Sequence, residues 1–153
     1  MEERLEQARY VLLNDLEEIP QLAERVEAFG VRHAVSSKVI FNLNLALDEI
    51  LTNVISYGYP DHLPHHISVT LMWRPEGMTA EVEDDGLPFN PLADAAPPQV
   101  DVSLEERSVG GLGIHFVKTF MDEVSYCREG ERNRLRLWKR LEGSGREAAH
   151  DPN

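Results

Sequence analysis

The stretch from Leu45 to Tyr57 constrains the fold more than any other part of this chain. Apolar residues recur in it and just before it at spacings of three and four, at Leu43, Ala46, Leu47, Ile50, Leu51 and Val54. This spacing predicts a helix with a broad buried face. Glu49 and Asn53 are four residues apart, so they share one face, near the margin of the apolar stripe. A polar pair at the edge of a buried helix requires an explanation.

Two explanations are open for this pair. Polar residues four positions apart are common on an ordinary surface helix. In a cation site, the Asn53 side chain would instead offer a neutral carbonyl oxygen suited to a hard ion such as Mg²⁺. Glu49 could then accept a proton from a hydroxyl group beside that ion. Two later stretches of the sequence favour the cation site.

Composition limits the classes of ligand and partner. The length of 153 residues fits one domain with a substantial core. The net charge of −12 argues against general binding to DNA, RNA or anionic membranes, because the field of the whole molecule repels polyanions. Cys127 is the only cysteine, which excludes an intrachain disulfide. The N-terminus lacks the form of a secretion signal and no stretch approaches roughly 20 consecutive apolar residues, so we expect a cytoplasmic protein.

Two helices are expected in the first part of the chain. Residues 8–14 have the pattern of a strand, and Asp15 to Phe29 that of a helix which Gly30 ends. Ser36 or Ser37 can cap the second helix, which contains Glu49 and stops near Tyr57, before Gly58.

The remaining pattern predicts strands. Residues 67–73 and 78–83 form a hairpin, and two more strands lie between about 123 and 140. These elements predict a two-layer α/β sandwich in which helices cover one face of a mixed, mainly antiparallel sheet. We expect one domain of residues 1–141, followed by a polar, disordered tail of residues 142–153.

Three histidines, His62, His65 and His66, precede the hairpin. Pro64 interrupts them and no nearby spacing supplies a closed ligand set, so a solvated loop is favoured over a metal site.

The second informative stretch is an acidic turn after the predicted strand 78–83. It reads Asp84-Asp85-Gly86-Leu87-Pro88, and its glycine and proline shape the turn. About twenty residues without a periodic pattern follow, from Asn90 to Val109. Segments of this length in a compact domain are often lids or binding loops.

The third stretch runs from Val109 to Met121 and places glycines at 110, 111 and 113 before an apolar helical pattern. Glycines let the backbone approach a ligand closely, and N–H groups at a helix start bind anions. The stretch matches neither the GxxxxGK[ST] phosphate loop nor the GxGxxG dinucleotide motif. It indicates an anion-binding segment, with a plain helix cap as the alternative.

In this order and spacing, the three stretches resemble the N, G1 and G2 boxes of the GHKL ATPase superfamily, which has the Bergerat fold. Within it, the chain most resembles the small serine kinases that act as bacterial anti-sigma factors. The first box is matched by Glu49 and Asn53, the second by residues 84–91, and the third by residues 111–113 and 120–126. Residues 133–139 also resemble the last strand of that family, so the resemblance extends from about residue 8 to 141.

The resemblance implies roles for individual residues. Asn53 would bind the Mg²⁺ that bridges the phosphates of ATP, and Glu49 would be the general base towards a serine hydroxyl. Asp84 would accept a hydrogen bond from the adenine amino group, with Gly86 giving the base room to approach. The other implied nucleotide-site residues are Pro88, Phe89, Gly110, Gly111, Leu112 and Gly113. Arg107 is a candidate phosphate-binding cation by location, whereas Lys118, a turn or more into the following helix, fits a solvated role better.

Three positions depart from the pattern of relatives. Tyr57 stands where many carry histidine, Pro88 replaces a glycine of the wider superfamily, and no threonine appears near Asn133, where the wider superfamily often has one. None of these departures removes the pair of Glu49 and Asn53.

The function implied by the resemblance is that of an ATP-dependent serine/threonine protein kinase which is also an anti-sigma regulatory factor. It would phosphorylate a serine of a STAS-type anti-sigma-factor antagonist, bind a sigma factor when that antagonist is not free, and form a homodimer. Two alternatives remain: an ATP-binding partner-switch module without phosphotransfer, and a histidine-kinase-like ATPase domain.

Overall fold

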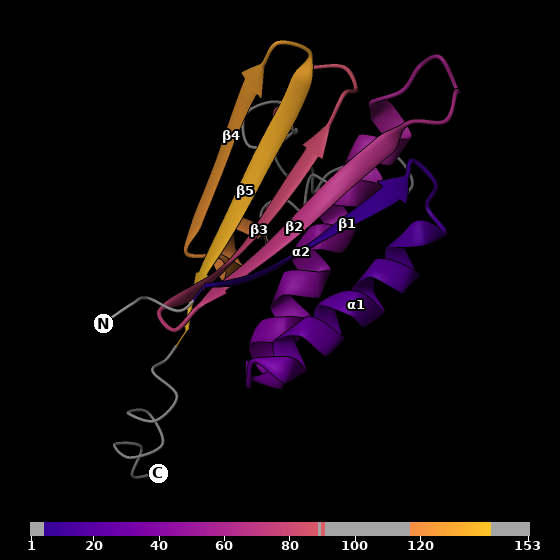
Figure 1. Cartoon of the computed structure of the whole chain (residues 1–153). Coiled ribbons are helices and arrows are strands. Elements are labelled where there is room, and N and C mark those ends of the chain that lie inside the picture. The colour runs from indigo at the N-terminus through magenta and orange to yellow at the C-terminus, as the bar shows by residue number, and fades with distance from the viewer. Residues whose placement is uncertain (1–4, 89, 91–116, 142–153) are drawn as a thin grey trace, which may run out of the picture.

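The computed structural model describes residues 5–88, 90 and 117–141, and it has two long helices on one face of a five-stranded sheet (Figure 1). Residues 117–120 are also helical. The expected two-layer α/β sandwich is confirmed, while the expected tail of residues 142–153 lies outside the described residues. The elements are β1 (Glu6–Leu13), α1 (Glu18–Arg32), α2 (Ser37–Tyr57), β2 (His66–Arg74), β3 (Gly77–Asp84), β4 (Glu123–Glu129) and β5 (Arg132–Arg140).

The strands lie in the order β1-β2-β3-β5-β4, and all four pairings are antiparallel. The mainly antiparallel sheet is therefore confirmed, but its mixed character is not found among the described strands. Tight turns join β2 to β3 and β4 to β5, and a connection that short can join only antiparallel neighbours. In the second hairpin, β5 is the strand that pairs with β3, and β4 lies at the edge of the sheet.

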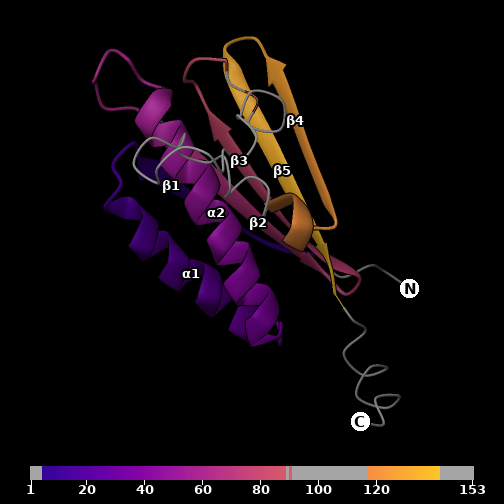
Figure 2. The same cartoon turned by 180° about the vertical axis from the view of Figure 1, so that it is seen from behind.

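Side-chain alternation gives the sheet one apolar face. Leu12 is in register with Ile67, Val69 with Val82, and Val82 with Leu135. Each of these five side chains is buried, and they belong to one core cluster with residues of α1 and α2. Figure 2 views the molecule from the side of the helices, where α1 and α2 lie next to each other over the sheet.

The opposite face of the sheet carries charged pairs between β3 and β5. Arg132 and Arg136 on β5 pair with Glu83 and Glu81 on β3, at 3.2 and 3.1 Å. Because these charges are solvated, each pair contributes at most about 1 kcal/mol to stability. These cross-strand pairs keep the centre of this face polar.

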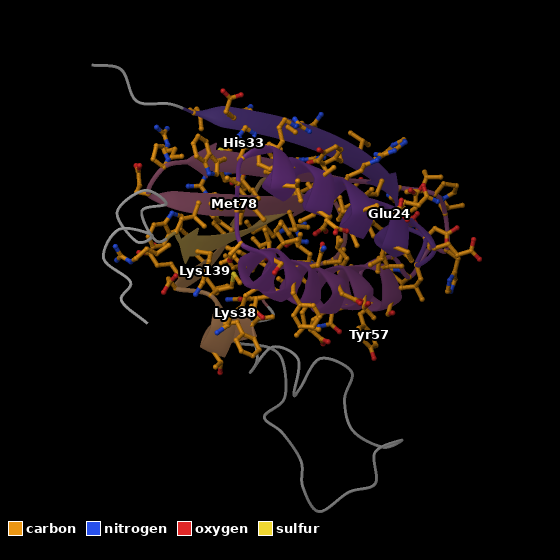
Figure 3. All side chains as sticks on the ribbon, turned by 90° about the horizontal axis from the view of Figure 1, so that it is seen from below. Glu24, His33, Lys38, Tyr57, Met78 and Lys139 are labelled. Atoms are coloured by element: carbon orange, nitrogen blue, oxygen red, sulfur yellow. The ribbon has the colours of Figure 1, made fainter. Side chains whose placement is uncertain are left out.

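The helix α2 begins and ends where the sequence predicts. The backbone N–H of Val39 donates to Oγ of the N-cap residue Ser36 at 3.2 Å, and the helix stops at Tyr57, before Gly58. Its fully buried residues include Leu43, Leu47, Ile50 and Leu51, each at most 1% exposed. Figure 3 shows Met78 of β3 in the layer between strands and helices, and Tyr57 at the outer side of α2.

The prediction that Gly30 ends α1 is wrong. The helix continues to Arg32, and the chain leaves it through His33 and Ala34, which has a positive φ of 61°. Gly30 is buried inside the helix, where a Cβ atom would lie 2.6 Å from Cδ1 of Ile40 on α2. The glycine is therefore needed for the close contact between the two helices and does not act as a terminator.

The sequence has no run of roughly 20 consecutive apolar residues, but one helix passes the weaker test of length and mean hydropathy. By length and composition, Ser37–Tyr57 is long and apolar enough to cross a bilayer. In the fold its apolar residues pack on the sheet and on α1, as in the core helix of a globular domain.

Candidate functional site

The pair of Glu49 and Asn53 lies on one face of α2, as its spacing predicts. Asn53 is 1% exposed, and its Nδ2 donates a hydrogen bond to Oε2 of Glu49 at 3.4 Å. Since a carboxylate can only accept, this contact fixes which end of the amide faces Glu49. The carbonyl oxygen of Asn53 must therefore point away from it.

That oxygen, Oδ1 of Asn53, is buried and accepts no hydrogen bond from residues 5–88, 90 or 117–141. A buried polar atom without a partner costs about 1–3 kcal/mol, so it marks a position where a ligand is expected. A neutral carbonyl oxygen is a suitable ligand for Mg²⁺, which commonly takes one or two protein oxygens and completes its shell with water and substrate phosphates. Asn53 thus fits the metal that the resemblance implies.

Glu49 is half-buried beside this oxygen. Burial raises the pKa of the Glu49 carboxyl above its ordinary value, the hydrogen bond from Asn53 opposes that rise, and the neighbouring charge of Asp48 adds to it. A carboxylate with a raised pKa is a better proton acceptor than an exposed one. Glu49 therefore has the environment that a general base requires.

Asp84, at the end of β3, is the third predicted site residue that the structure places. It is 4% exposed, and its Oδ1 accepts hydrogen bonds from the Gly86 N–H at 2.8 Å and from Nδ2 of Asn133 at 2.9 Å. Burial raises the pKa of Asp84 above its ordinary value, an effect that these two hydrogen bonds and the nearby Arg128 reduce and that the charge of Asp85 increases. Both of these hydrogen bonds end on Oδ1, which leaves Oδ2 as the oxygen for a ligand.

Asn133 was not assigned a role from the sequence. It lies on β5 directly opposite Asp84 and is 5% exposed. Its Nδ2 also donates to the carbonyl of Leu87 at 2.9 Å, and its Oδ1 accepts from Nη1 of Arg128 at 3.0 Å and from the hydroxyl of Tyr126. An asparagine in line with the inward-facing Leu135 and Leu137 of an alternating strand was the signal that could have identified it.

Gly86 and Gly58 bring the two predicted boxes together. The N–H of Leu87 donates to the carbonyl of Gly58 at 2.9 Å, which joins the turn after β3 to the end of α2. A Cβ atom on Gly86 would lie 2.8 Å from that carbonyl oxygen and 3.1 Å from Oδ1 of Asp84. Gly86 is therefore required by its own backbone contacts, in addition to the room for a base that we expected.

Residues 61–64 of the loop that we expected to be solvated are exposed, whereas His65 at its end is partly buried. Its Nε2 lies 2.8 Å from Oδ2 of Asp61, its Nδ1 lies 3.4 Å from Oδ2 of Asp85, and its ring stacks on Tyr59 with centroids 4.4 Å apart. The hydrogen bond with Asp61, and secondarily the one with Asp85, raises the pKa of His65. The cluster supports the turn that carries Asp84, because Asp85 is the next residue.

Pro88 follows that turn and is exposed. Lys118 lies in the helical residues 117–120 and is exposed as well. The other predicted site residues, Phe89, Arg107, Gly110, Gly111, Leu112 and Gly113, lie outside the described residues.

With this geometry in place, the chain was compared with known proteins. The family model described as "Histidine kinase-like ATPase domain" matches residues 12–139. The serine/threonine-protein kinase BtrW of Bordetella bronchiseptica is 30% identical over 112 residues, which is 73% of this chain and 78% of BtrW.

Two further relatives have similar lengths of match. The serine-protein kinase RsbW of Listeria monocytogenes is 27% identical over 103 residues, covering 65% of this chain and 66% of RsbW. The anti-sigma F factor of Clostridium novyi is 28% identical over 112 residues, covering 73% of this chain and 77% of that factor. The resemblance seen in the sequence is confirmed: the chain belongs to the histidine kinase-like ATPase family, in the branch of the GHKL superfamily that contains anti-sigma serine kinases.

Proposed function

We propose that this protein is an ATP-dependent serine/threonine kinase that acts as an anti-sigma regulatory factor and phosphorylates a serine of an antagonist protein. The observation that carries the proposal is the unpaired, buried Oδ1 of Asn53 beside Glu49. The names of the relatives, two serine kinases and an anti-sigma factor, support the same function.

Asn53 is proposed to hold Mg²⁺ through Oδ1. A bound Mg²⁺ would supply charge neutralisation for the phosphates of ATP, which a protein of net charge −12 needs. The amide end of Asn53 keeps its hydrogen bond to Glu49, so the same side chain orients the carboxylate and offers an oxygen to the ion.

Asp84 is proposed to bind the adenine amino group through Oδ2, because Oδ1 is already occupied by two donors. The turn containing Gly86 is tied to α2 through the carbonyl of Gly58, so the proposed adenine end and metal end of the site share one rigid support. We further propose that Pro88 and Phe89 flank the base, and that Arg107, Gly110, Gly111, Leu112 and Gly113 close over the phosphates.

Glu49 is proposed to accept the proton of the substrate serine hydroxyl as its oxygen bonds to the γ-phosphorus of ATP. The bond between that phosphorus and the oxygen shared with the β-phosphate breaks, and ADP leaves. Catalysis of this transfer depends mainly on position and charge, so one well-placed carboxylate suffices as the base.

The proposed partners are a STAS-type antagonist and a sigma factor, bound by a cytoplasmic homodimer. Exchange between the two partners would follow from their different affinities for the nucleotide-bound protein, before and after the antagonist is phosphorylated.

The test is a phosphotransfer assay with Mg-ATP and a STAS-type protein from the same organism, read as phosphoserine by mass spectrometry. Glu49→Gln should lower the rate at least about 100-fold, in the range of general-base catalysis, and should leave ATP binding intact. Asp48→Asn is the matched control, since Asp48 is the adjacent, exposed carboxylate and affects Glu49 only as the smallest of the influences on its pKa, so this variant should keep most of the rate. ATP binding without transfer by the unmodified protein would instead support a partner-switch module without kinase activity.

A further inference from the structure

The orientation of the Asn133 amide is fixed by the chemistry of its neighbours. The guanidinium of Arg128 can only donate, so it must face Oδ1 of Asn133, at 3.0 Å. The carbonyls of Leu87 and Gly86 and the carboxylate of Asp84 accept, and they face Nδ2 at 2.9, 3.4 and 2.9 Å. An amide with both ends occupied in this way has one stable orientation.

This arrangement opposes the effect of burial, which on balance holds the pKa of Asp84 above its ordinary value, and so makes the ionised form easier to reach. In a buried position a carboxyl group tends to take up a proton, but an amide N–H that points at it stabilises the carboxylate. The backbone N–H of Gly86 acts in the same direction, and the charge of Arg128 adds to it. The other charged or titratable groups near Asp84 are Asp85, which opposes ionisation, and Tyr59, whose own pKa is raised by burial and by Asp84 and Asp85.

The protonation state decides which purine Asp84 can bind. An ionised carboxylate only accepts hydrogen bonds, so it pairs with the amino group of adenine and repels the carbonyl oxygen at the same position of guanine. A protonated carboxyl group also donates, and it can then bind that carbonyl. The selectivity for adenine therefore depends on keeping the proton off Asp84.

We propose that Asn133, oriented by Arg128 and Tyr126, is a specificity-determining residue that keeps Asp84 as a pure hydrogen-bond acceptor and so selects adenine over guanine nucleotides. This proposal rests on the proposed function, because it requires a purine nucleotide at Asp84. Asn133 acts through Asp84, which makes it a positioning residue.

Arg128 has a second contact that strengthens the assignment. Its Nη1 donates to the carbonyl of Gly86 at 3.1 Å as well as to Asn133. One cation on β4 thus holds both the amide that faces Asp84 and the turn that follows Asp84. Charge-assisted hydrogen bonds of this kind are about twice as strong as neutral ones.

The test measures equilibrium binding of Mg-ATP and Mg-GTP by calorimetry between about pH 6 and about pH 8. Asn133→Leu should lower the ratio of ATP to GTP affinity about tenfold or more, the amount expected for losing a hydrogen bond to a charged group. The loss of selectivity for ATP over GTP should grow as the pH falls, because Asp84 then takes up a proton more readily. Asn133→Thr should restore much of the ratio, since its hydroxyl can donate to Asp84.

Arg132→Gln is the matched control, because Arg132 is the adjacent residue on β5, pairs with Glu83 on the polar face, and should leave the ratio unchanged. If Asn133→Leu does not fold, Arg128→Gln serves as the second variant and should shift the ratio in the same direction. An equal, pH-independent loss of affinity for both nucleotides in Asn133→Leu would overturn the proposal for Asn133. An unchanged ratio of ATP to GTP affinity in Arg128→Gln would also overturn it. Either result would leave the proposed kinase function standing. No binding of either nucleotide by the unmodified protein would overturn both.

Discussion

The backbone N–H of Leu87 donates to the carbonyl oxygen of Gly58 at 2.9 Å, and this single bond joins the turn after β3 to the last turn of α2. Asp84 lies three residues before Leu87, and Asn53 lies five residues before Gly58. Two polar side chains from distant parts of the sequence thereby share one support. A change at this junction should affect both ends of the proposed nucleotide site.

Gly86→Ala tests the junction directly. Its new Cβ would lie 2.8 Å from the Gly58 oxygen, so the turn must move, at a cost of about 1–3 kcal/mol in the free energy of unfolding. We expect lower thermal stability together with a loss of ATP affinity, measured by thermal denaturation and calorimetry. Gly77→Ala is the control, because its Cβ would meet the Trp138 ring at the other end of β3. That variant should lose stability and keep its affinity.

Asn53→Leu should separate stability from function. Removing the unpaired Oδ1 relieves a buried unsatisfied atom, so the free energy of unfolding without ligand should fall by less than about 1 kcal/mol, or rise. The Mg²⁺-dependent part of ATP affinity should be lost, because the proposed metal ligand is gone. Denaturation with and without Mg-ATP measures both quantities. An undiminished effect of Mg²⁺ on ATP affinity would remove the metal role of Asn53.

The pH dependence of phosphotransfer should reflect Glu49. The base works only when ionised, and burial raises its pKa above the ordinary 4.5, so the rate should fall with decreasing pH at a midpoint above that value. The free energy of unfolding depends on pH with the opposite sign to the rate. The contribution of Glu49 to stability is full below pH 4.5 and is lost as the pH rises through its raised folded-state pKa. Glu49→Gln should therefore stabilise the protein at neutral pH. Urea denaturation of both forms across pH measures this difference. An equal or lower stability of Glu49→Gln at neutral pH would contradict the prediction.

His65 should make stability depend on pH near neutrality. Its pKa is raised by Asp61, so its contribution is full below the ordinary value of 6.5 and is lost as the pH rises through the folded-state value. His65→Gln should cost more stability below 6.5 than well above it, as measured by urea denaturation. The neighbouring, exposed His66 provides the control His66→Gln, because it lies outside the contacts of His65 with Asp61 and Asp85. If His65→Gln lost the same stability below pH 6.5 as well above it, the role assigned to the His65 ion pair would be wrong.

Much of the fold could be predicted because local patterns define it. The spacing of Leu47, Ile50 and Leu51 with the cap at Ser36 located α2, and strict alternation located the β2–β3 hairpin. Gly30 was misread because a glycine near the end of an apolar pattern usually ends a helix, whereas here it admits the side chain of Ile40. That contact lies between two helices and leaves no local signal.

The candidate site was predicted in part for the same reason. Glu49 and Asn53 share one helix, so their contact follows from spacing. Asp84 and Asn133 are 49 residues apart, and only the register of β3 with β5 brings them together. The position of His65 depends likewise on the path of the loop between α2 and β2, which no periodicity describes.

The place of β5 in the sheet has a consequence for biosynthesis. It is the last described strand along the chain, yet it lies inside the sheet, between β3 and β4, and carries Asn133. On the ribosome, α2 and the first hairpin emerge long before this strand does. The partner of Asp84 is therefore translated 49 residues after Asp84 itself, and a nascent chain that ends between the two lacks the amide that faces this carboxylate.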